Sequence, residues 1–275
     1  MKLQRIDQGN WAYCLAQAKN ANKRVSTGRE LIEDRLERGV NDQTHFEGGA
    51  WTAEDSNVVD GAILLARAEF NPLIPYAKQA VEAQRTGEFY LTDEIRKGKR
   101  PFTQVLRQIA EKDEIKPLEQ KRVLNLGQAK THPVPTDSFA DDPTIRWKAE
   151  SPELANRYGL FLRNELPENL RLPEVTVYLP RITGEDYARG HWLDGLDRNY
   201  RSAFICNDRS LSDDYGSVFG VSVESAEGTS RQINEPKVRG YTPRQAKQYL
   251  TIIDGVIEGK RGTASLRKVA DFFKK

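Results

Sequence analysis

The stretch from Leu193 to Val223 contains no Lys, Glu, Gln, Met or Trp, although Lys, Glu and Gln are common elsewhere in the chain. All codons of these five amino acids end in a purine. The stretch instead holds mainly Asp, Asn, Ser, Tyr and Arg on a sparse apolar frame. Every residue present can be reached by changing the first two bases of an Asn codon that ends in a pyrimidine. The absence of these five amino acids favours a surface whose coding sequence has been diversified at adenines. The alternative is an ordinary polar segment, because Asp, Asn, Ser and Gly also dominate turns.

Other absences restrict the class of protein. The chain has only two cysteines, Cys14 and Cys206, far apart, so no disulfide framework is expected. The N-terminus lacks an apolar signal segment, and no run approaches the ~20 apolar residues of a membrane span. We therefore expect a cytoplasmic protein with no membrane span, and display at the surface through a partner stays open. The net charge of +2, from 42 basic and 40 acidic residues, gives no electrostatic case for nucleic-acid binding.

Catalytic and metal-binding patterns are also scarce. None of the three histidines shares helix-turn spacing with a Cys, a Glu or a second His, so we expect no metal site and no cofactor. No phosphate-binding glycine loop and no nucleophile elbow occurs. One alternative from the enzyme class remains open: a hydrolase or transferase that uses His132 with Asp137, Asp141 or Asp142.

Hydrophobic periodicity predicts helices over most of residues 1–120. They are a helix from Asp7 to Lys19, one from Ser26 or Thr27 to Gly39, one from Thr52 through VVDGAILLARAEF, one after Asn71-Pro72, and short helices from Thr103 and Pro117.

The pattern changes near Lys121, where strand and helix signals mix. RVLNLG, EVTVYLP, HWLDGL, SAFIC and SVFGVSV read as short strands, and a helix begins at Ser151-Pro152. The chain reads as helical again from Tyr241. The order of elements predicts an α+β fold with a helical N-terminal region over 1–120, a mixed domain over 121–227 and a helical extension over 228–275.

A recognisable frame carries the biased stretch: ARGHWLDGL from Ala188, Arg201-Ser202, Arg209-x-Leu211, and FGVSV from Phe219. The frame resembles the C-terminal signature of C-type lectin-fold domains of the formylglycine-generating-enzyme class. Together with the codon-like bias, it is similar to the variable proteins of diversity-generating retroelements, in the archaeal branch. In that family an error-prone reverse transcriptase rewrites adenines in a cassette that encodes the binding face. The resemblance implies a variable region over about 188–225.

The resemblance implies a binding protein and not an enzyme, because formylglycine-generating enzymes need a catalytic cysteine pair and this domain has only Cys206. We expect a macromolecular ligand, most simply a protein, and largely exposed variable positions around a buried frame that includes Trp192. Tyr, Asn, Ser and Asp are also residues that paratopes use. The predicted ligand-binding residues are Asp194, Asp197, Asn199, Tyr200, Phe204, Cys206, Asn207, Asp208, Ser210, Ser212, Asp213, Asp214, Tyr215, Ser217 and Phe219.

Overall fold

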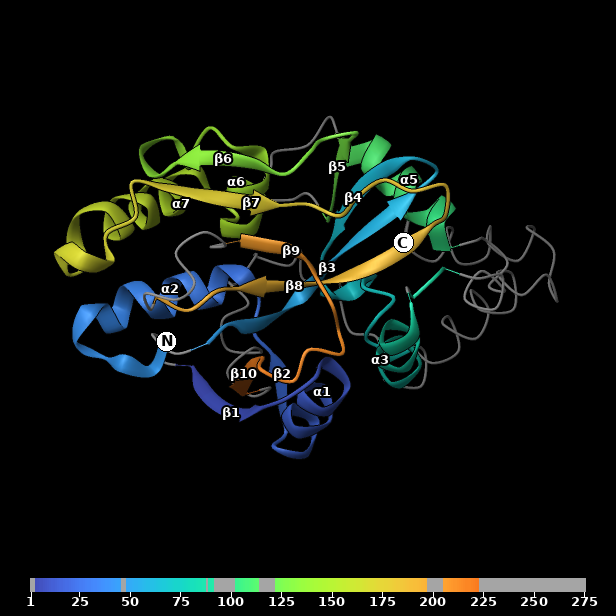
Figure 1. Cartoon of the computed structure of the whole chain (residues 1–275), viewed down its shortest axis with the longest axis horizontal. Helices are drawn as coiled ribbons and strands as arrows, with labels where there is room; N and C mark the ends of the chain where they lie inside the picture. Colours follow the sequence, from blue (N-terminus) through green and yellow to red (C-terminus); the bar gives the residue numbers. More distant parts are fainter. Residues whose placement is uncertain are drawn as a thin grey trace, which may run out of the picture.

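The computed structural model describes residues 3–45, 48–87, 89–91, 102–113, 122–196 and 205–222. Within these residues ten strands form one mixed sheet, ordered β1-β10-β3-β8-β9-β7-β6, with β2 beside β10 and with β4 and then β5 extending from β3 (Figure 1). The strands are β1 (Gln4–Gln8), β2 (Lys23–Val25), β3 (Ala50–Val59), β4 (Ala62–Ala66), β5 (Val123–Gly127), β6 (His132–Pro135), β7 (Glu174–Tyr178), β8 (Tyr187–Leu193), β9 (Ile205–Arg209) and β10 (Ser217–Ser222).

Helices cover both faces of this sheet, and each face has its own apolar core. One core joins the sheet to α2, α6 and α7, and the other joins it to α1, α3 and α5. The helices are α1 (Trp11–Asn20), α2 (Gly28–Arg38), α3 (Ala77–Thr86), α5 (Phe102–Asp113), α6 (Pro143–Ala149) and α7 (Pro152–Leu160). Short helical turns are η1 (Gly39–Asn41), η2 (Gln43–His45), η3 (Ala68–Phe70), η5 (Thr136–Ser138), η6 (Phe161–Glu165) and η7 (Glu168–Leu170).

Strand β3 lies at the centre of the sheet, and every one of its residues is buried. It pairs antiparallel with β4 and β8 and, over its first residues, parallel with β10. A strand covered on both faces does not show alternating apolar and polar residues. Its buried polar residues must therefore find partners inside the molecule: the Glu54 carboxylate accepts hydrogen bonds from the Gly28 amide (3.0 and 3.1 Å) and from Arg67 (3.1 Å).

The α+β fold class is confirmed, but the expected helical region over residues 1–120 is wrong. That region supplies β1, β2, β3 and β4, and β1 and β2 pair with β10 near the other end of the described chain. The helix expected from Thr52 is instead the hairpin of β3 and β4. Asp60 and Gly61 form its two-residue turn with φ values of 46° and 75°, the conformation that a tight hairpin requires.

Several local predictions are confirmed. The Thr27 side chain caps α2 in a reciprocal capping box with Glu30, and Gly39 ends that helix with φ 65°. Ser151 caps α7, with Pro152 in its first turn. The first helix begins at Trp11 and not at Asp7, because the Asn10 side chain accepts the Tyr13 amide and the preceding residues form β1.

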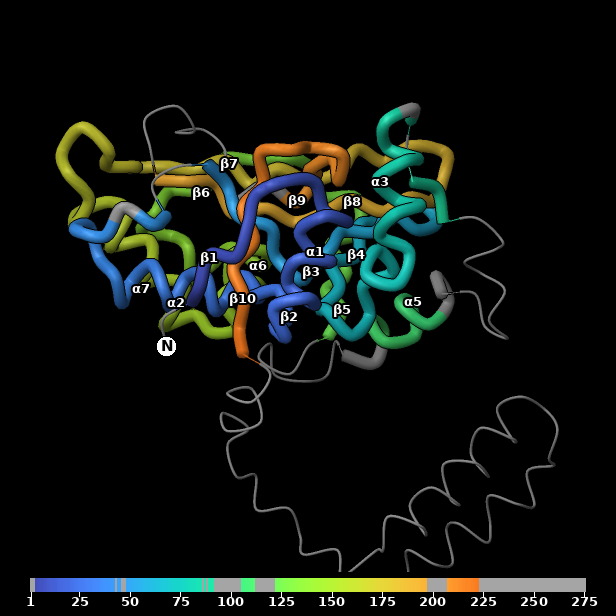
Figure 2. The backbone as a smooth tube through the Cα atoms, turned by 90° about the horizontal axis from the view of Figure 1, so that it is seen from below, coloured from blue at the N-terminus to red at the C-terminus, as the bar shows by residue number. Residues whose placement is uncertain are grey.

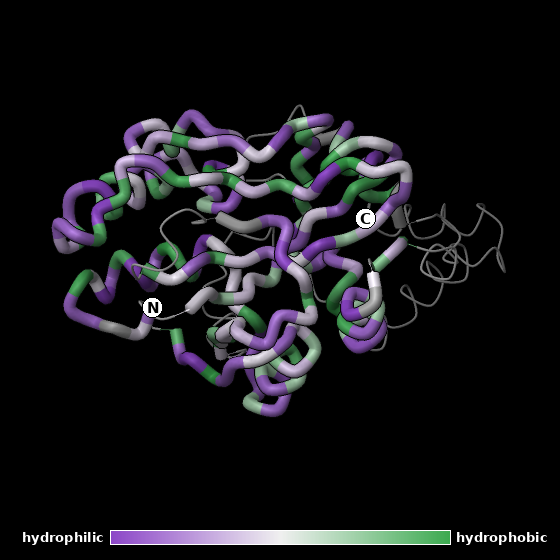
Figure 3. The backbone as a smooth tube through the Cα atoms, in the orientation of Figure 1, coloured by the Kyte–Doolittle hydropathy of each residue, from purple (hydrophilic) through white to green (hydrophobic). Residues whose placement is uncertain are grey.

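The helix expected after Asn71-Pro72 begins only at Ala77, as α3, whereas the one expected from Thr103 is α5. The helices expected at Pro117 and over 228–275 lie outside the described residues. Along the described part of the chain, hydrophobic and hydrophilic residues alternate in short stretches (Figure 3). No helix in that part combines the length and the hydrophobicity needed to cross a membrane.

Candidate functional site

The segment between β9 and β10 lies beside the start of α1 (Figure 2). Two backbone hydrogen bonds fix it there: the Trp11 amide donates to the Leu211 carbonyl (3.0 Å), and the Gly9 amide donates to the Gly216 carbonyl (2.8 Å). The Leu211 side chain is fully buried and holds the start of the segment against the core. A polar loop is therefore held at both ends by contacts with the N-terminal part of the chain.

Six predicted binding residues in or beside this segment reach the surface. Tyr215 has 69% of its surface exposed and Asp214 is also exposed. The carboxylate of Asp213 accepts the Tyr215 amide (3.0 Å) and pairs with Arg209, which shapes the turn that presents these two residues. The half-buried members of the group are Asp208, Ser210, Ser212 and Asp213.

Four other predicted binding residues are buried, which corrects the expectation that the variable positions are exposed: Asp194, Asn207, Ser217 and Phe219. For Ser217 and Phe219 the reason is that both faces of β10 are covered, so strand alternation turns a side chain from one core to the other and not toward solvent. The Phe219 ring stacks on His45 with centroids 4.6 Å apart. These four side chains support the surface and are out of reach of a macromolecular ligand.

The remaining predicted positions are Asp197, Asn199, Tyr200 and Phe204, which lie outside the described residues. Cys206 is placed by its backbone in β9, opposite Trp192 of β8, and its side chain is not among the described ones.

A cluster of tryptophans forms the base under the exposed loop. Trp51 makes edge-on contacts with Trp11 (centroids 5.9 Å apart) and with Trp192 (4.7 Å). The guanidinium of Arg209 lies over the Trp192 ring at 4.6 Å. A Cβ atom added at Gly216 would lie 2.0 Å from Trp51 Nε1, so the loop backbone rests directly on the cluster. The predicted frame residues are buried, as expected: Trp192, Leu193, Leu196, Leu211, Gly220 and Val221.

His132 and Asp142, two members of the alternative catalytic set, are hydrogen-bonded (Nε2 to Oδ2, 2.7 Å). Both sides of this pair are engaged further, because His132 Nδ1 bonds the Lys130 carbonyl (2.8 Å) and Asp142 Oδ1 caps α6 by accepting the Ile145 amide (2.8 Å). Burial opposes protonation, but the bonds to Asp142 and to the carbonyl prevail and raise the pKa of His132. His132 thus holds the Asp142 carboxylate in the position in which it caps α6.

The other two carboxylates of that set do not complete a catalytic group around the pair. Asp137 pairs with Arg163, and Asp141 is exposed. Within the described residues, no group of three or more His, Cys, Asp and Glu side chains is close enough together to hold a metal ion.

A second histidine, His191, is buried in the sheet and contacts Ser56. Ser56 Oγ lies 2.7 Å from His191 Nε2, which is the separation of a nucleophile and its base, but both side chains are 0% exposed. Burial lowers the pKa of His191 well below its ordinary value, and the charges of Lys148 and Arg67 lower it further. This neutral histidine joins β3 to β8 at a place that no substrate can reach.

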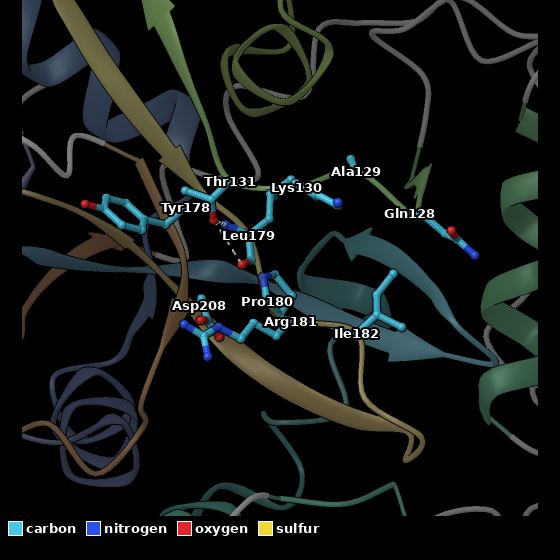
Figure 4. Close-up of a pocket in the computed structure, with 10 residues that line it drawn as sticks. All are labelled: Gln128, Ala129, Lys130, Thr131, Tyr178, Leu179, Pro180, Arg181, Ile182 and Asp208. Atoms are coloured by element: carbon cyan, nitrogen blue, oxygen red, sulfur yellow. Dashed lines mark hydrogen bonds between the residues drawn. The ribbon is translucent and has the colours of Figure 1, made fainter.

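A pocket of about 740 Å³ opens beside β9, lined by residues from three segments (Figure 4). They are the connection between β5 and β6, the end of β7 with the residues after it, and Asp208 of β9. Because β7 and β9 pair in parallel, with Tyr178 opposite Cys206, the residues after β7 lie next to β9. Asp208 is thus both a predicted binding residue and part of the pocket wall.

The sequence alone did not reveal the pocket or the contribution of the N-terminus. Asn10 Nδ2 donates to Asp214 Oδ1 (3.3 Å), and the 43% exposed Tyr13 donates to Asp7 (2.7 Å) nearby. No periodicity within either segment signals a contact between residues so far apart in sequence. The one available signal was the turn dipeptide Asp60-Gly61, which would have placed the N-terminal part of the chain in the sheet.

The architecture is that of a C-type lectin fold. A solved structure described by the words "Accommodation of massive sequence variation in Nanoarchaeota by the C-type lectin fold" superposes with a TM-score of 0.51. It is 10% identical in sequence, and the match covers 80% of this chain and 97% of that one. No family model matches the sequence, and no curated protein is significantly similar to it. The likeness therefore concerns the fold.

Proposed function

We propose that this chain is a non-enzymatic recognition protein that presents a diversified surface to a protein ligand. More specifically, it acts as the variable protein of an archaeal diversity-generating retroelement, on a C-type lectin fold of the formylglycine-generating-enzyme class. The observation that carries the proposal is the coincidence of two features. The stretch Leu193–Val223, which lacks the amino acids encoded only by purine-ending codons, contains the exposed loop that rests on the tryptophan cluster.

The geometry of the loop supports recognition more than catalysis. Tyr215 offers an exposed aromatic side chain with few rotatable bonds, and Asp214, Ser212 and Ser210 of the same loop offer groups that form hydrogen bonds. Its base is buried and rigid, so the loop can change residues without losing its position. The solved structure of similar fold is described as accommodating massive sequence variation, which fits the same use of the scaffold.

The coding locus tests this proposal. We expect a neighbouring near-copy of the segment for residues 188–225 whose differences fall at adenines of the copy. We also expect a reverse-transcriptase gene nearby. A locus with neither feature, or a copy with differences spread over all four bases, would contradict the retroelement assignment.

A hydrolase centred on His132 is the second candidate, and the 2.7 Å contact with Asp142 is the observation in its favour. Because Asp142 caps α6 and His132 also bonds the Lys130 carbonyl, we propose that the contact is structural. A His132→Gln variant separates the two functions. It should lower the melting temperature and leave ligand binding unchanged, whereas loss of a hydrolytic activity of the wild-type chain would support the enzyme.

A further inference from the structure

The pocket beside β9 carries an excess of positive charge. Lys130 and Arg181 line it and are exposed, and neither side chain forms an ion pair with a residue that the structure describes. The carboxylate in the wall, Asp208, lies 3.2 Å from the guanidinium nitrogen of Arg189, which balances its charge. Two cations are therefore left to attract a negatively charged group of a ligand.

The rest of the wall is largely apolar. Leu179 and Pro180 are buried at the pocket, and Ile182 is 38% exposed, one of the few large hydrophobic side chains on the described surface. A volume of about 740 Å³ lies within the range of roughly 300–1,000 Å³ that is usual for ligand sites. The combination fits a short peptide segment in which an acidic side chain is next to an apolar one.

The pocket also joins constant and variable parts of the chain. Lys130, Arg181 and Ile182 lie outside the biased stretch, whereas Asp208 lies within it. Codons that end in a pyrimidine can place Asp, Asn, Ser, His or Arg at position 208 but never Lys or Glu. Changes at this one residue thus alter the charge of the pocket wall, while the two constant cations remain.

We propose that the pocket is a constant subsite for an acidic peptide segment of the protein ligand, and that residue 208 adjusts its preference for charge. This inference rests on the proposed recognition function. A carboxylate of the ligand binds between Lys130 and Arg181, and an adjacent apolar side chain packs on Ile182. The variable loop then supplies the contacts that differ from one ligand to another.

Fluorescence anisotropy with the full chain and two labelled peptides tests the subsite. One peptide alternates Glu and Leu, and the other has Gln in place of every Glu. We expect the acidic peptide to bind more tightly, and more weakly as salt is added. Arg181→Gln should raise its Kd about 5- to 20-fold, which is what loss of a charge-assisted hydrogen bond at a partly exposed site predicts.

Three further variants sharpen the result. Asp208→Asn should lower the Kd of the acidic peptide about 3-fold, because it removes the negative charge of the wall. Lys130→Gln should act in the same direction as Arg181→Gln. Lys78→Gln, at an exposed position of α3 that does not line the pocket, is the matched control and should leave the Kd unchanged. Thermal melts confirm that each variant is folded.

Equal binding of the two peptides, or no binding of either, would overturn the subsite. So would a loss of binding in Tyr215→Ser that Arg181→Gln does not reproduce, and in that case the recognition function at the loop would stand. A last binding experiment uses inorganic phosphate in place of the peptides. If phosphate binds in an Arg181-dependent manner and the acidic peptide does not, the pocket is a site for small anions and the peptide assignment is wrong.

Discussion

Trp192 lies directly before the biased stretch and Tyr215 lies within it, and their surroundings give these two aromatic residues opposite roles. Trp192 is 1% exposed and contacts Trp51, whereas Tyr215 is 69% exposed and no hydrogen bond of its hydroxyl to a described residue is present. Removal of a large buried side chain lowers the stability of the fold, whereas an exposed ring at a turn can contribute to binding without contributing to stability.

The first prediction compares these two residues. Trp192→Ala should lower the free energy of unfolding by about 3–5 kcal/mol, the usual consequence of removing a buried aromatic side chain. Tyr215→Ala and Asp214→Ala should each change it by less than about 0.5 kcal/mol. Urea denaturation of the three variants measures these values. A large loss for Tyr215→Ala with little change for Trp192→Ala would reverse the assignment of frame and surface.

The second prediction concerns Gly216, which separates exposed Tyr215 from buried Ser217. Its missing side chain leaves the space that Trp51 occupies, so Gly216→Ala should destabilise the chain by about 1–3 kcal/mol through overpacking. Gly184→Ala is the matched control, because a Cβ there meets no atom within 4 Å. Equal melting temperatures of the two variants would show that the loop does not rest on the tryptophans.

The third prediction is the pH dependence of stability. The pKa of His191 is lowered in the folded chain, so below about pH 6.5 the unfolded chain takes up a proton that the folded chain does not. The free energy of unfolding should therefore decrease as the pH is lowered below about 6.5. His132 has a raised pKa, so its contribution is full below about pH 6.5 and is lost as pH rises through the folded value.

The two histidines can be separated by thermal melts. His132→Gln should lower the melting temperature more at about pH 5.5 than at about pH 8.5. Since the His132 side chain is 37% exposed, the difference is small, no more than ~1 kcal/mol after solvent screening. A variant that is destabilised equally at both pH values would show that the pair contributes by packing alone.

At the scale of elements, clear periodicity and capping signals led to correct predictions, whereas the buried β3–β4 hairpin was mistaken for a helix. The strand at Glu174–Tyr178 and the helix at Pro152–Leu160 have clear periodicity and capping signals, and both were predicted. The β3–β4 hairpin has apolar residues on both faces, and its run VVDGAILLA fits a helical period as well as a strand. Only the Asp60-Gly61 turn distinguishes the two.

The fourth prediction tests that turn. Gly61 has φ 75°, and a Cβ there would meet no neighbouring atom, so Gly61→Ala isolates the effect of backbone conformation. We expect a loss of about 1 kcal/mol, because alanine disfavours positive φ. Asp60→Asn is the control and should change stability by less than about 0.5 kcal/mol, since Asn adopts the left-handed region readily and the ion pair of Asp60 with Arg107 is exposed. An unchanged stability in Gly61→Ala would contradict the role of this residue in the turn.

At the scale of the whole molecule, the N-terminal strands complete the sheet that carries the loop between β9 and β10. β10 pairs with β1 on one side and with β2 and β3 on the other, so residues from both parts of the chain meet at the loop. Long-range pairing of this kind leaves no local signal in the sequence, which is why β8 and β10 were predicted as strands but the N-terminal strands were not.

The fifth prediction follows from this pairing. A chain without residues 1–26 should lose cooperative thermal unfolding, because β10 then lacks two of its three neighbouring strands. Circular dichroism measures the transition. Addition of a peptide with the sequence of residues 1–26 should restore it, which separates loss of the strands from general damage. A truncated chain that melts cooperatively by itself would show that the N-terminal strands are dispensable.

The loop between β9 and β10 is attached to the N-terminal segment through its carbonyl oxygens, at Leu211 and at Gly216, and the donors belong to Trp11 and Gly9. Every amino acid has this oxygen, including proline, which lacks the amide hydrogen. A replacement anywhere between these two attachment points leaves both bonds chemically available. If the side chains of this loop are diversified as proposed, the loop can therefore change its chemistry and still keep both backbone attachments to the N-terminal segment.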